Sequence, residues 1–339
     1  MRAFRINKPN EYGMTDVPTP ETMDDELLLK VGAAAICHSD IDALCGLRKH
    51  MIRYPNILGH EFAGTVVEAG RGVRSFKPGD TVAMECMIGC GECAPCHLRT
   101  IHCEHYSELG FLRDGAFAEY VAVPARNAHK FTGMSMEFAA TAECAGNGYA
   151  AVDAADIKPG ERVMIIGPGP IGLYALQFAR LKHPSQLIMV GTREERLKFA
   201  RPFATHTINI REGDALGALM EITAGNGADV VLQCATTNSA FTLAFDGAGK
   251  NARIIIEGFG DSEAGVSLRM DQFIKKTLTV KGLGGMNSEQ FEYVLRLMRM
   301  GVIDPSKLIT HTFALENIID GFNLLRDHTG DAVKVIIKP

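Results

Sequence analysis

The sequence predicts an α/β protein in which a β-rich region precedes a doubly wound parallel sheet. Residues 1 to about 130 contain short apolar strands separated by glycine and proline turns. From about residue 135, apolar strands alternate with helical patterns, which is typical of parallel strands joined by crossover helices. A glycine-rich loop at 167–172 lies between the first of these strands and its helix.

The β-rich region opens the chain, and its mixed character returns at the end. The clearest expected strands in the first part are 26–31, 64–68 and 118–123, separated by turns such as the one at 77–80. We therefore expect an irregular β-barrel there. After about residue 284 the expected elements are a helix at 288–298, an extended segment at 308–313, a helix at 315–327 and a closing strand at 333–338.

The middle region begins with an alanine-rich helical stretch at 135–153. Strands and helical patterns then alternate, which predicts one parallel sheet with helices on its faces. The expected strands are 162–166, 186–190, 230–233, 253–257 and 278–281.

The composition is that of a globular protein with two domains of ordinary size. The chain has 339 residues, of which 46% are hydrophobic and 22% charged. Its formal net charge of −5 and the lack of a long basic run argue against nucleic-acid binding. The N-terminus has no apolar signal, and glycines and prolines interrupt the most apolar stretch, 163–179. We therefore expect a cytoplasmic protein that is neither secreted nor inserted in a membrane.

A G-x-G-x-x-G motif directly follows the apolar strand 162–166 and precedes the apolar helix 173–181. In this setting the glycines allow a tight turn, close approach of the backbone to a pyrophosphate, and close packing of helix on strand. The N-terminus of the helix then faces the phosphates. The motif predicts a dinucleotide site in a Rossmann domain, with the loop residues Gly167, Gly169, Pro170, Ile171 and Gly172.

The residue about twenty positions beyond these glycines distinguishes NAD from NADP, because an acidic residue there binds the ribose 2′-hydroxyl of NAD. Here the second strand is followed by Gly191, Thr192 and Arg193. Without a carboxylate a 2′-phosphate is not repelled, and Arg193 is able to pair with it. We expect NADP in preference to NAD. The two glutamates that follow argue the other way, and the alternative is that Arg193 and Arg196 are solvated.

Nine cysteines are many for a chain without a sign of export, and five of them fall between Cys86 and Cys103. Four follow the spacing C-x₂-C-x₂-C with a fourth cysteine after six further residues, and disulfides between such close neighbours would be strained. A closed set of four thiolates leaves no open metal position, which predicts a structural zinc site. Its ligands are Cys90, Cys93, Cys96 and Cys103.

A second zinc site is predicted around Cys37 and the pair His60-Glu61. A thiolate, an imidazole and a carboxylate form a mixed set that suits zinc with one open position. Catalysis requires that position, because water or a substrate must occupy it. The alternative is that Cys37 is a small buried apolar residue and that the pair lies at an ordinary strand edge.

Together these motifs resemble the zinc-dependent alcohol and polyol dehydrogenases of the medium-chain dehydrogenase/reductase superfamily. The resemblance spans nearly the whole chain. It includes Cys37 with Ser39, the segment 59–73, the four cysteines, the segment 114–121 and the glycine loop.

The resemblance implies that a Rossmann domain, 146–283, is inserted into a discontinuous β-rich catalytic domain formed by 1–145 and 284–339. It also implies that the hydroxyl of Ser39 takes the proton of the substrate. Many members pass that proton on through a histidine, and Asp42 stands in its place here.

For the catalytic zinc, the resemblance makes Cys37 and His60 ligands and assigns Glu143 to the place where polyol dehydrogenases carry a glutamate. Cys144, one residue further on, is the rival ligand. Glu61 and Glu143 are then expected to share the metal, one of them directly and the other through water or by exchange.

The implied function is hydride transfer between NAD(P) and a polyol, sugar alcohol or secondary alcohol, or its ketone, with two zinc ions per chain. One alternative is an amino-alcohol dehydrogenase of the threonine type, which needs a cation site for the substrate amine. Another is a non-catalytic nicotinamide-binding protein of the same fold. The family implies a homodimer or homotetramer, and pairing through the strand near 278–281 is a hypothesis for its interface.

Overall fold

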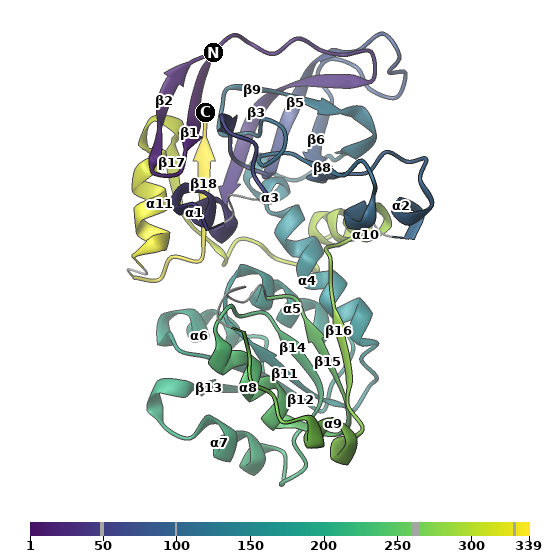
Figure 1. Cartoon of the computed structure of the whole chain (residues 1–339), viewed down its shortest axis with the longest axis vertical. Coiled ribbons are helices and arrows are strands. Elements are labelled where there is room, and N and C mark those ends of the chain that lie inside the picture. The colour runs from purple at the N-terminus through teal and green to yellow at the C-terminus, as the bar shows by residue number, and fades with distance from the viewer. Residues whose placement is uncertain (48–50, 99, 259–264, 328–329) are drawn as a thin grey trace. The chain divides into compact units, whose positions relative to one another are not determined.

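The computed structural model describes residues 1–47, 51–98, 100–258, 265–327 and 330–339, which form two compact units (Figure 1). The first unit consists of Met1–Glu143 together with Asn287–Pro339, and the second of Cys144–Met286. The chain therefore leaves the first unit once and returns to it once. The chain divides between residues 143 and 144 and between 286 and 287, whereas the boundaries implied by the resemblance are 145/146 and 283/284.

The first unit is built on a seven-stranded sheet with the order β10-β6-β5-β3-β18-β17, in which β9 also pairs with β3. A three-stranded sheet, β2-β1-β4, and a two-stranded sheet, β7-β8, accompany it. The strands are β1 (Arg2–Lys8), β2 (Glu11–Asp16), β3 (Glu26–Ile36), β4 (Asn56–Ile57), β5 (Glu61–Ala69), β6 (Thr81–Met84), β7 (Met87–Ile88), β8 (Ser107–Glu108), β9 (Tyr120–Pro124), β10 (Ala128–Lys130), β17 (Ile309–Ala314) and β18 (Lys334–Lys338). The predicted strands 26–31, 64–68 and 118–123 correspond to β3, β5 and β9.

The last strand of the sequence, β18, lies inside this sheet between β3 and β17 (Figure 1). It is antiparallel to β3, with Val335 opposite Ile36, and parallel to β17. Its first four residues are buried, as expected for a central strand that is covered on both faces. Lys334 is one of them, so β18 brings a charged side chain into the interior.

Local capping contacts set the ends of the helices in the first unit. α1 starts after Cys37, whose N–H donates to Asp40 Oδ2 at 2.9 Å, and it stops at Gly46, which has a left-handed φ of +80°. α10 starts after Asn287, which forms a capping box with Gln290. The helices of this unit are α1 (His38–Cys45), α2 (Ala94–Leu98), α3 (Met136–Ala140), α10 (Ser288–Arg299) and α11 (Ile318–Arg326).

The second unit contains a six-stranded parallel sheet with the order β13-β12-β11-β14-β15-β16. The order reverses between β11 and β14, which is the switch point of a doubly wound sheet, and this confirms the predicted fold class. The strands are β11 (Arg162–Ile166), β12 (Gln186–Gly191), β13 (His206–Asn209), β14 (Ala228–Gln233), β15 (Ala248–Ile256) and β16 (Thr279–Gly282). The sequence did not predict β13, because this short strand has a single buried residue, Ile208.

Helices pack against this sheet in pairs. α5 and α6 contact each other beside β12, and α7 contacts α8, which lies on β14 and β15. The glycines and the apolar faces of the helices make such close packing possible. The helices are α4 (Ala142–Ala155), which begins at the end of the first unit, α5 (Pro170–Arg180), α6 (Glu194–Ala200), α7 (Ala215–Ile222), α8 (Asn238–Gly247) and α9 (Met270–Lys276). Within the described ranges, no helix is both long and apolar enough to cross a membrane.

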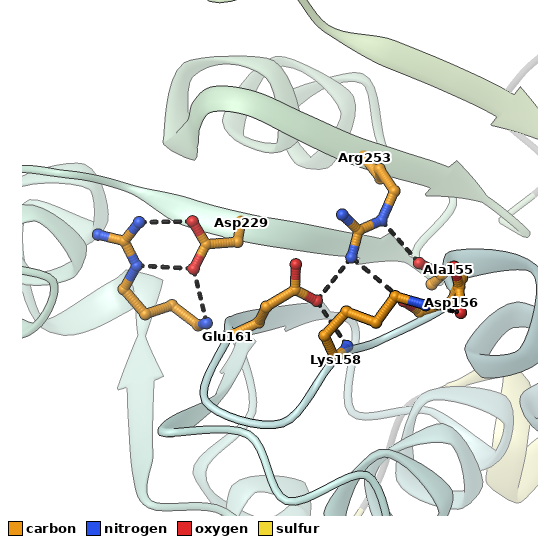
Figure 2. Close-up of polar contacts among 7 residues, drawn as sticks. Ala155, Asp156, Lys158, Glu161, Asp229 and Arg253 are labelled. Carbon is orange, nitrogen blue, oxygen red and sulfur yellow. Dashed lines mark hydrogen bonds and ion pairs between the residues drawn. The ribbon is translucent and has the colours of Figure 1, made fainter.

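Ion pairs join the parallel strands near the ends where β11 and β14 begin (Figure 2). Arg162 donates to Asp229 Oδ2 through its backbone N–H and through Nε, each at 2.8 Å. Arg253 donates to Glu161 Oε2 at 2.6 Å and to the Ala155 carbonyl oxygen at 2.8 Å. Open α/β sheets bind their ligands at the other, carboxyl ends of the strands, where the glycine loop lies.

Candidate metal and cofactor sites

The four cysteines of the predicted structural site lie together. Each offers a sulfur atom within 4.8 Å of the others. Cys90 Sγ is 3.9 Å from Cys96 Sγ, and Cys93 Sγ is 3.8 Å from Cys103 Sγ. Sulfur atoms at the corners of a tetrahedron with Zn–S bonds of about 2.3 Å are about 3.8 Å apart. The spacing of the thiols therefore fits a zinc ion, and we call this segment, 90–103, the four-cysteine loop.

Backbone amides already favour a thiolate in this loop. The N–H groups of Glu92 and Cys93 donate to Cys90 Sγ at 3.4 and 3.3 Å and lower the pKa of Cys90 to about 6. Burial, together with Cys93, raises the pKa of Cys96 to about 11. Four thiolates at this distance repel one another, so a divalent cation is what allows all four to ionise together.

Cys37, His60 and Glu61 form a second group whose donor atoms lie within 4.8 Å of one another, and we call it the histidine cluster. Cys37 follows β3, and Glu61 begins the neighbouring strand β5 with His60 directly before it. His60 is 4% exposed and Glu61 is fully buried. Two adjacent strand ends thus bring together a sulfur, a nitrogen and an oxygen donor, which is a donor set that zinc accepts.

Asp40 contacts two members of the histidine cluster, Cys37 and His60. Its buried carboxylate accepts the Cys37 N–H at Oδ2, and its Oδ1 lies 3.4 Å from His60 Nδ1. Burial acts to lower the pKa of His60, but Asp40 and Cys37 outweigh it and leave that pKa well above its ordinary value. Neither Asp40 Oδ1 nor His60 Nδ1 has a hydrogen-bond partner among the described residues, so the carboxylate acts on the ring through its charge.

Glu61 has a partner that the sequence did not indicate. Lys334 Nζ lies 2.8 Å from Oε1 and 2.7 Å from Oε2 of Glu61, and 3.5 Å from the carbonyl oxygen of Ile36. The lysine is 1% exposed and the glutamate 0%, so each charge needs the other to offset its desolvation. Lys334 therefore holds both of the oxygen atoms with which Glu61 would bind a metal.

Glu143 lies outside the two groups of metal donors found among the described residues. It stands in the first turn of α4, is 7% exposed, and its Oε1 is 3.6 Å from Cys86 Sγ. Burial, and then the charge of Glu143, raise the pKa of Cys86 well above its ordinary value, so the thiol remains a donor. Cys144 is buried beside Glu143, and Ser39 is half-buried in the first turn of α1.

The glycine loop has the conformation that its motif predicts. Gly167 adopts a φ of +104°, a region that favours glycine, and Gly169 caps α5, whose first residue is Pro170. A Cβ atom on Gly172 would lie 2.0 Å from the Gly167 carbonyl oxygen. The turn and the packing of α5 therefore both require glycine, and the first N–H groups of the helix are available to a phosphate.

Arginines follow β12, at the place where the ribose end of a dinucleotide is recognised. Arg193 caps α6, and Arg196 within α6 is 9% exposed, so the alternative of a solvated Arg196 is wrong. Burial and the neighbouring Arg193 lower the pKa of Arg196 to about 9. Burial and the charge of Arg211 likewise lower the pKa of Arg193. An anion at this place would relieve the repulsion among these cations.

Two family models match the chain. The model of the alcohol dehydrogenase GroES-like domain covers residues 23–133, and that of the zinc-binding dehydrogenase covers residues 170–299. The chain belongs to the family of zinc-dependent medium-chain dehydrogenases/reductases, and it is an NAD(P)-dependent alcohol dehydrogenase.

Individual relatives are similar to this chain over nearly all of their length. The L-threonine 3-dehydrogenase of Bacillus velezensis is 34% identical over 98% of each chain. Among solved structures, a zinc-binding dehydrogenase from Sinorhizobium meliloti bound to NADP has a TM-score of 0.94 and 29% identity, covering 100% of this chain and 99% of its own. Galactitol-1-phosphate dehydrogenase from Escherichia coli has a TM-score of 0.91 and 27% identity and is covered completely, as is this chain.

Proposed function

We propose that the protein oxidises a secondary hydroxyl group of a polyol, a sugar alcohol or a similar small alcohol and transfers the hydride to NADP. The observation that carries this proposal is the histidine cluster, in which the sulfur of Cys37 lies with a buried imidazole and a buried carboxylate at two adjacent strand ends. When bound, zinc acts as a Lewis acid that lowers the pKa of a substrate hydroxyl group.

The residues around the metal site have separate tasks in this proposal. Cys37 and His60 hold the ion, and Asp40 keeps the imidazole in the orientation that binding requires. Ser39, in the first turn of α1, accepts the proton that leaves the substrate. Glu143 lies in the same unit and supplies a carboxylate to the metal, while Glu61, whose two oxygen atoms Lys334 holds, reaches the metal only through water or by exchange.

In this proposal the second unit binds the dinucleotide, with the pyrophosphate at the N-terminus of α5. The 2′-phosphate lies with Arg193 and Arg196, next to Thr192 at the end of β12. The depressed pKa of Arg196 supports this, because a phosphate would stabilise its charged form. The four-cysteine loop, by contrast, binds a zinc ion that stabilises the fold and takes no part in the reaction.

Two kinds of relative bear on the substrate. Galactitol-1-phosphate dehydrogenase and the 2R,3R-butanediol dehydrogenase of Bacillus subtilis, which is 26% identical, favour a polyol or diol. The similarity to L-threonine 3-dehydrogenases supports a second candidate, oxidation of the hydroxyl group of a hydroxy amino acid. Both candidates present a secondary alcohol to the same metal site.

We also propose a cytoplasmic homodimer or homotetramer. The nine cysteines are free thiols, as in proteins of a reducing compartment. The outermost strand β16 offers an edge at which the same strand of a second copy can pair and extend the sheet. Sedimentation that shows only monomers at micromolar concentration would contradict this assembly.

The experiment that tests the function follows the absorbance of reduced nicotinamide with polyols, diols, secondary alcohols and L-threonine, with NAD and NADP supplied separately. We expect turnover of secondary alcohols with NADP and two zinc ions per chain by elemental analysis. Turnover of L-threonine alone would establish the second candidate. Zinc-loaded protein that oxidises no member of the panel would contradict both.

A further inference from the structure

Gly191 occupies the position where NAD-selective dinucleotide-binding domains place a carboxylate. It is the last residue of β12 and pairs with Asn209 of β13, so its backbone belongs to an ordinary strand. Its φ also lies outside the left-handed region that favours glycine. The conformation of the backbone therefore accepts any L-residue here, and the requirement for glycine must have another cause.

The cause is a proline in the glycine loop. A Cβ atom on Gly191 would lie 2.5 Å from both Cγ and Cδ of Pro168, and 3.4 Å from Leu197 Cδ2. Non-bonded carbon atoms lie about 3.5–4.0 Å apart at their optimum. The leucine contact is tolerable, but the pyrrolidine ring is rigid and has no other rotamer in which to avoid a clash.

The loop is also unable to retreat from β12. The Gly167 N–H donates to the Val190 carbonyl oxygen at 2.9 Å, and the Cys234 N–H donates to the Ile166 carbonyl oxygen at 2.9 Å. On the side of β14, a Cβ atom at position 167 would already lie 3.0 Å from Ala235. The loop is thus held between the ends of β12 and β14, and a shift of Pro168 would displace the backbone that is to bind the pyrophosphate.

We propose that Pro168 determines cofactor selectivity by keeping position 191 without a side chain, so that a carboxylate which would bind the ribose hydroxyls and repel a 2′-phosphate has no room. The inference rests on the proposed cofactor site. It assigns selectivity to a pair of residues on two segments, Pro168 and Gly191. The segment that follows β12, with Arg193 and Arg196, then meets the ribose end without a carboxylate at position 191.

The test measures binding of NADPH and NADH by nicotinamide fluorescence in the zinc-loaded enzyme, with circular dichroism to verify the fold. Gly191→Asp alone should weaken binding of both cofactors about tenfold or more, because the clash with Pro168 displaces the loop that is to bind the pyrophosphate. Gly191→Ala, which adds the Cβ atom without a charge, should weaken both in the same way. The double variant Gly191→Asp/Pro168→Ala should recover NADH binding and not NADPH binding.

The matched control is Gly191→Asp/Pro159→Ala. Pro159 is an exposed proline of the same unit, and its replacement should recover nothing. Strong NADH binding by Gly191→Asp alone, or no recovery in the double variant, would overturn the proposal. A wild-type enzyme that prefers NADH would instead contradict the proposed cofactor preference, while the recovery by Pro168→Ala would still decide whether the steric coupling exists.

Discussion

The four-cysteine loop and the histidine cluster both gather metal donors, but they are assembled in opposite ways. All donors of the loop come from one short segment, 90–103, and three of its four cysteines are only partly buried. Two of the three residues of the histidine cluster, His60 and Glu61, are buried, and they contact Asp40 from α1 and Lys334 from β18. The loop therefore depends on its own sequence, whereas the cluster depends on the folding of the whole first unit.

The most severe test of this comparison removes the imidazole of the cluster. We expect His60→Ala to lower turnover by about 10³-fold, because the metal supplies several kcal/mol of transition-state stabilisation. Elemental analysis should show one zinc per chain, retained in the four-cysteine loop. Loss of both ions would mean that the two sites are not independent.

The next largest effect concerns the buried ion pair. Lys334→Met should lower the free energy of unfolding by about 3–5 kcal/mol, because the Glu61 carboxylate is then buried without its partner. The control is Lys338→Met on the same strand, whose partner Glu137 lies 2.6 Å away and whose side chain is 49% exposed. Urea unfolding should show a change of about 1 kcal/mol or less for this control. Equal effects of the two substitutions would refute the special role of Lys334.

In the four-cysteine loop, Cys93→Ser should lower the free energy of unfolding and leave turnover largely unchanged. We expect one zinc ion fewer per chain and a loss of about 3 kcal/mol of unfolding free energy, since removing a structural metal is among the largest single-site effects. Turnover at low temperature should stay within about threefold of wild type, because a closed site takes no part in the reaction. A collapse of turnover with the fold intact would show that the loop contributes to the chemistry.

A substitution in the cofactor site should have a smaller effect, and it should change cofactor binding without affecting either metal site. Arg196→Ala should weaken NADPH binding about 10- to 100-fold, the value of one or two charge-assisted hydrogen bonds, and leave NADH binding nearly unchanged. Fluorescence titration of the two cofactors checks this. An equal loss of affinity for NADPH and NADH would mean that Arg196 supports the glycine loop structurally and does not bind the 2′-phosphate.

The smallest expected effect lies at the opposite end of the sheet from the cofactor. Hydrogen bonds from Arg162 lower the pKa of Asp229 below its ordinary value of 3.8. The pair therefore stabilises the fold above about pH 4, and its contribution is lost as the pH falls through the lowered pKa. Asp229→Asn should cost about 1 kcal/mol at pH 7 and less below pH 3.8. A difference in urea unfolding that does not shrink on acidification would exclude this ion pair as its cause.

Sequence reasoning succeeded where the determinants are local. The four-cysteine spacing, the glycine loop and the alternation of strands and helices each lie within a short window, and the structure has them where they were expected. Lys334 escaped prediction because it lies 273 residues from Glu61, and a lysine in an apolar strand gives no sign of its partner. The burial of Arg196 was not predicted, because burial of one helix face decides its environment, although its spacing of three residues from Arg193 is compatible with a shared face.

The place of β18 in the middle of the sheet also gives the protein an order of assembly. At about 5–20 residues per second, a ribosome reaches Lys334 on the order of 15 to 55 seconds after Glu61. Until then the sheet lacks a central strand and the Glu61 carboxylate lacks its counter-charge, so the histidine cluster is completed only once β18 has been made. The four-cysteine loop has all its donors far earlier. Ribosome-bound chains that stop before β18 should therefore bind zinc in the four-cysteine loop and not in the histidine cluster, so we expect the two sites to fill in the order in which their last residues are made.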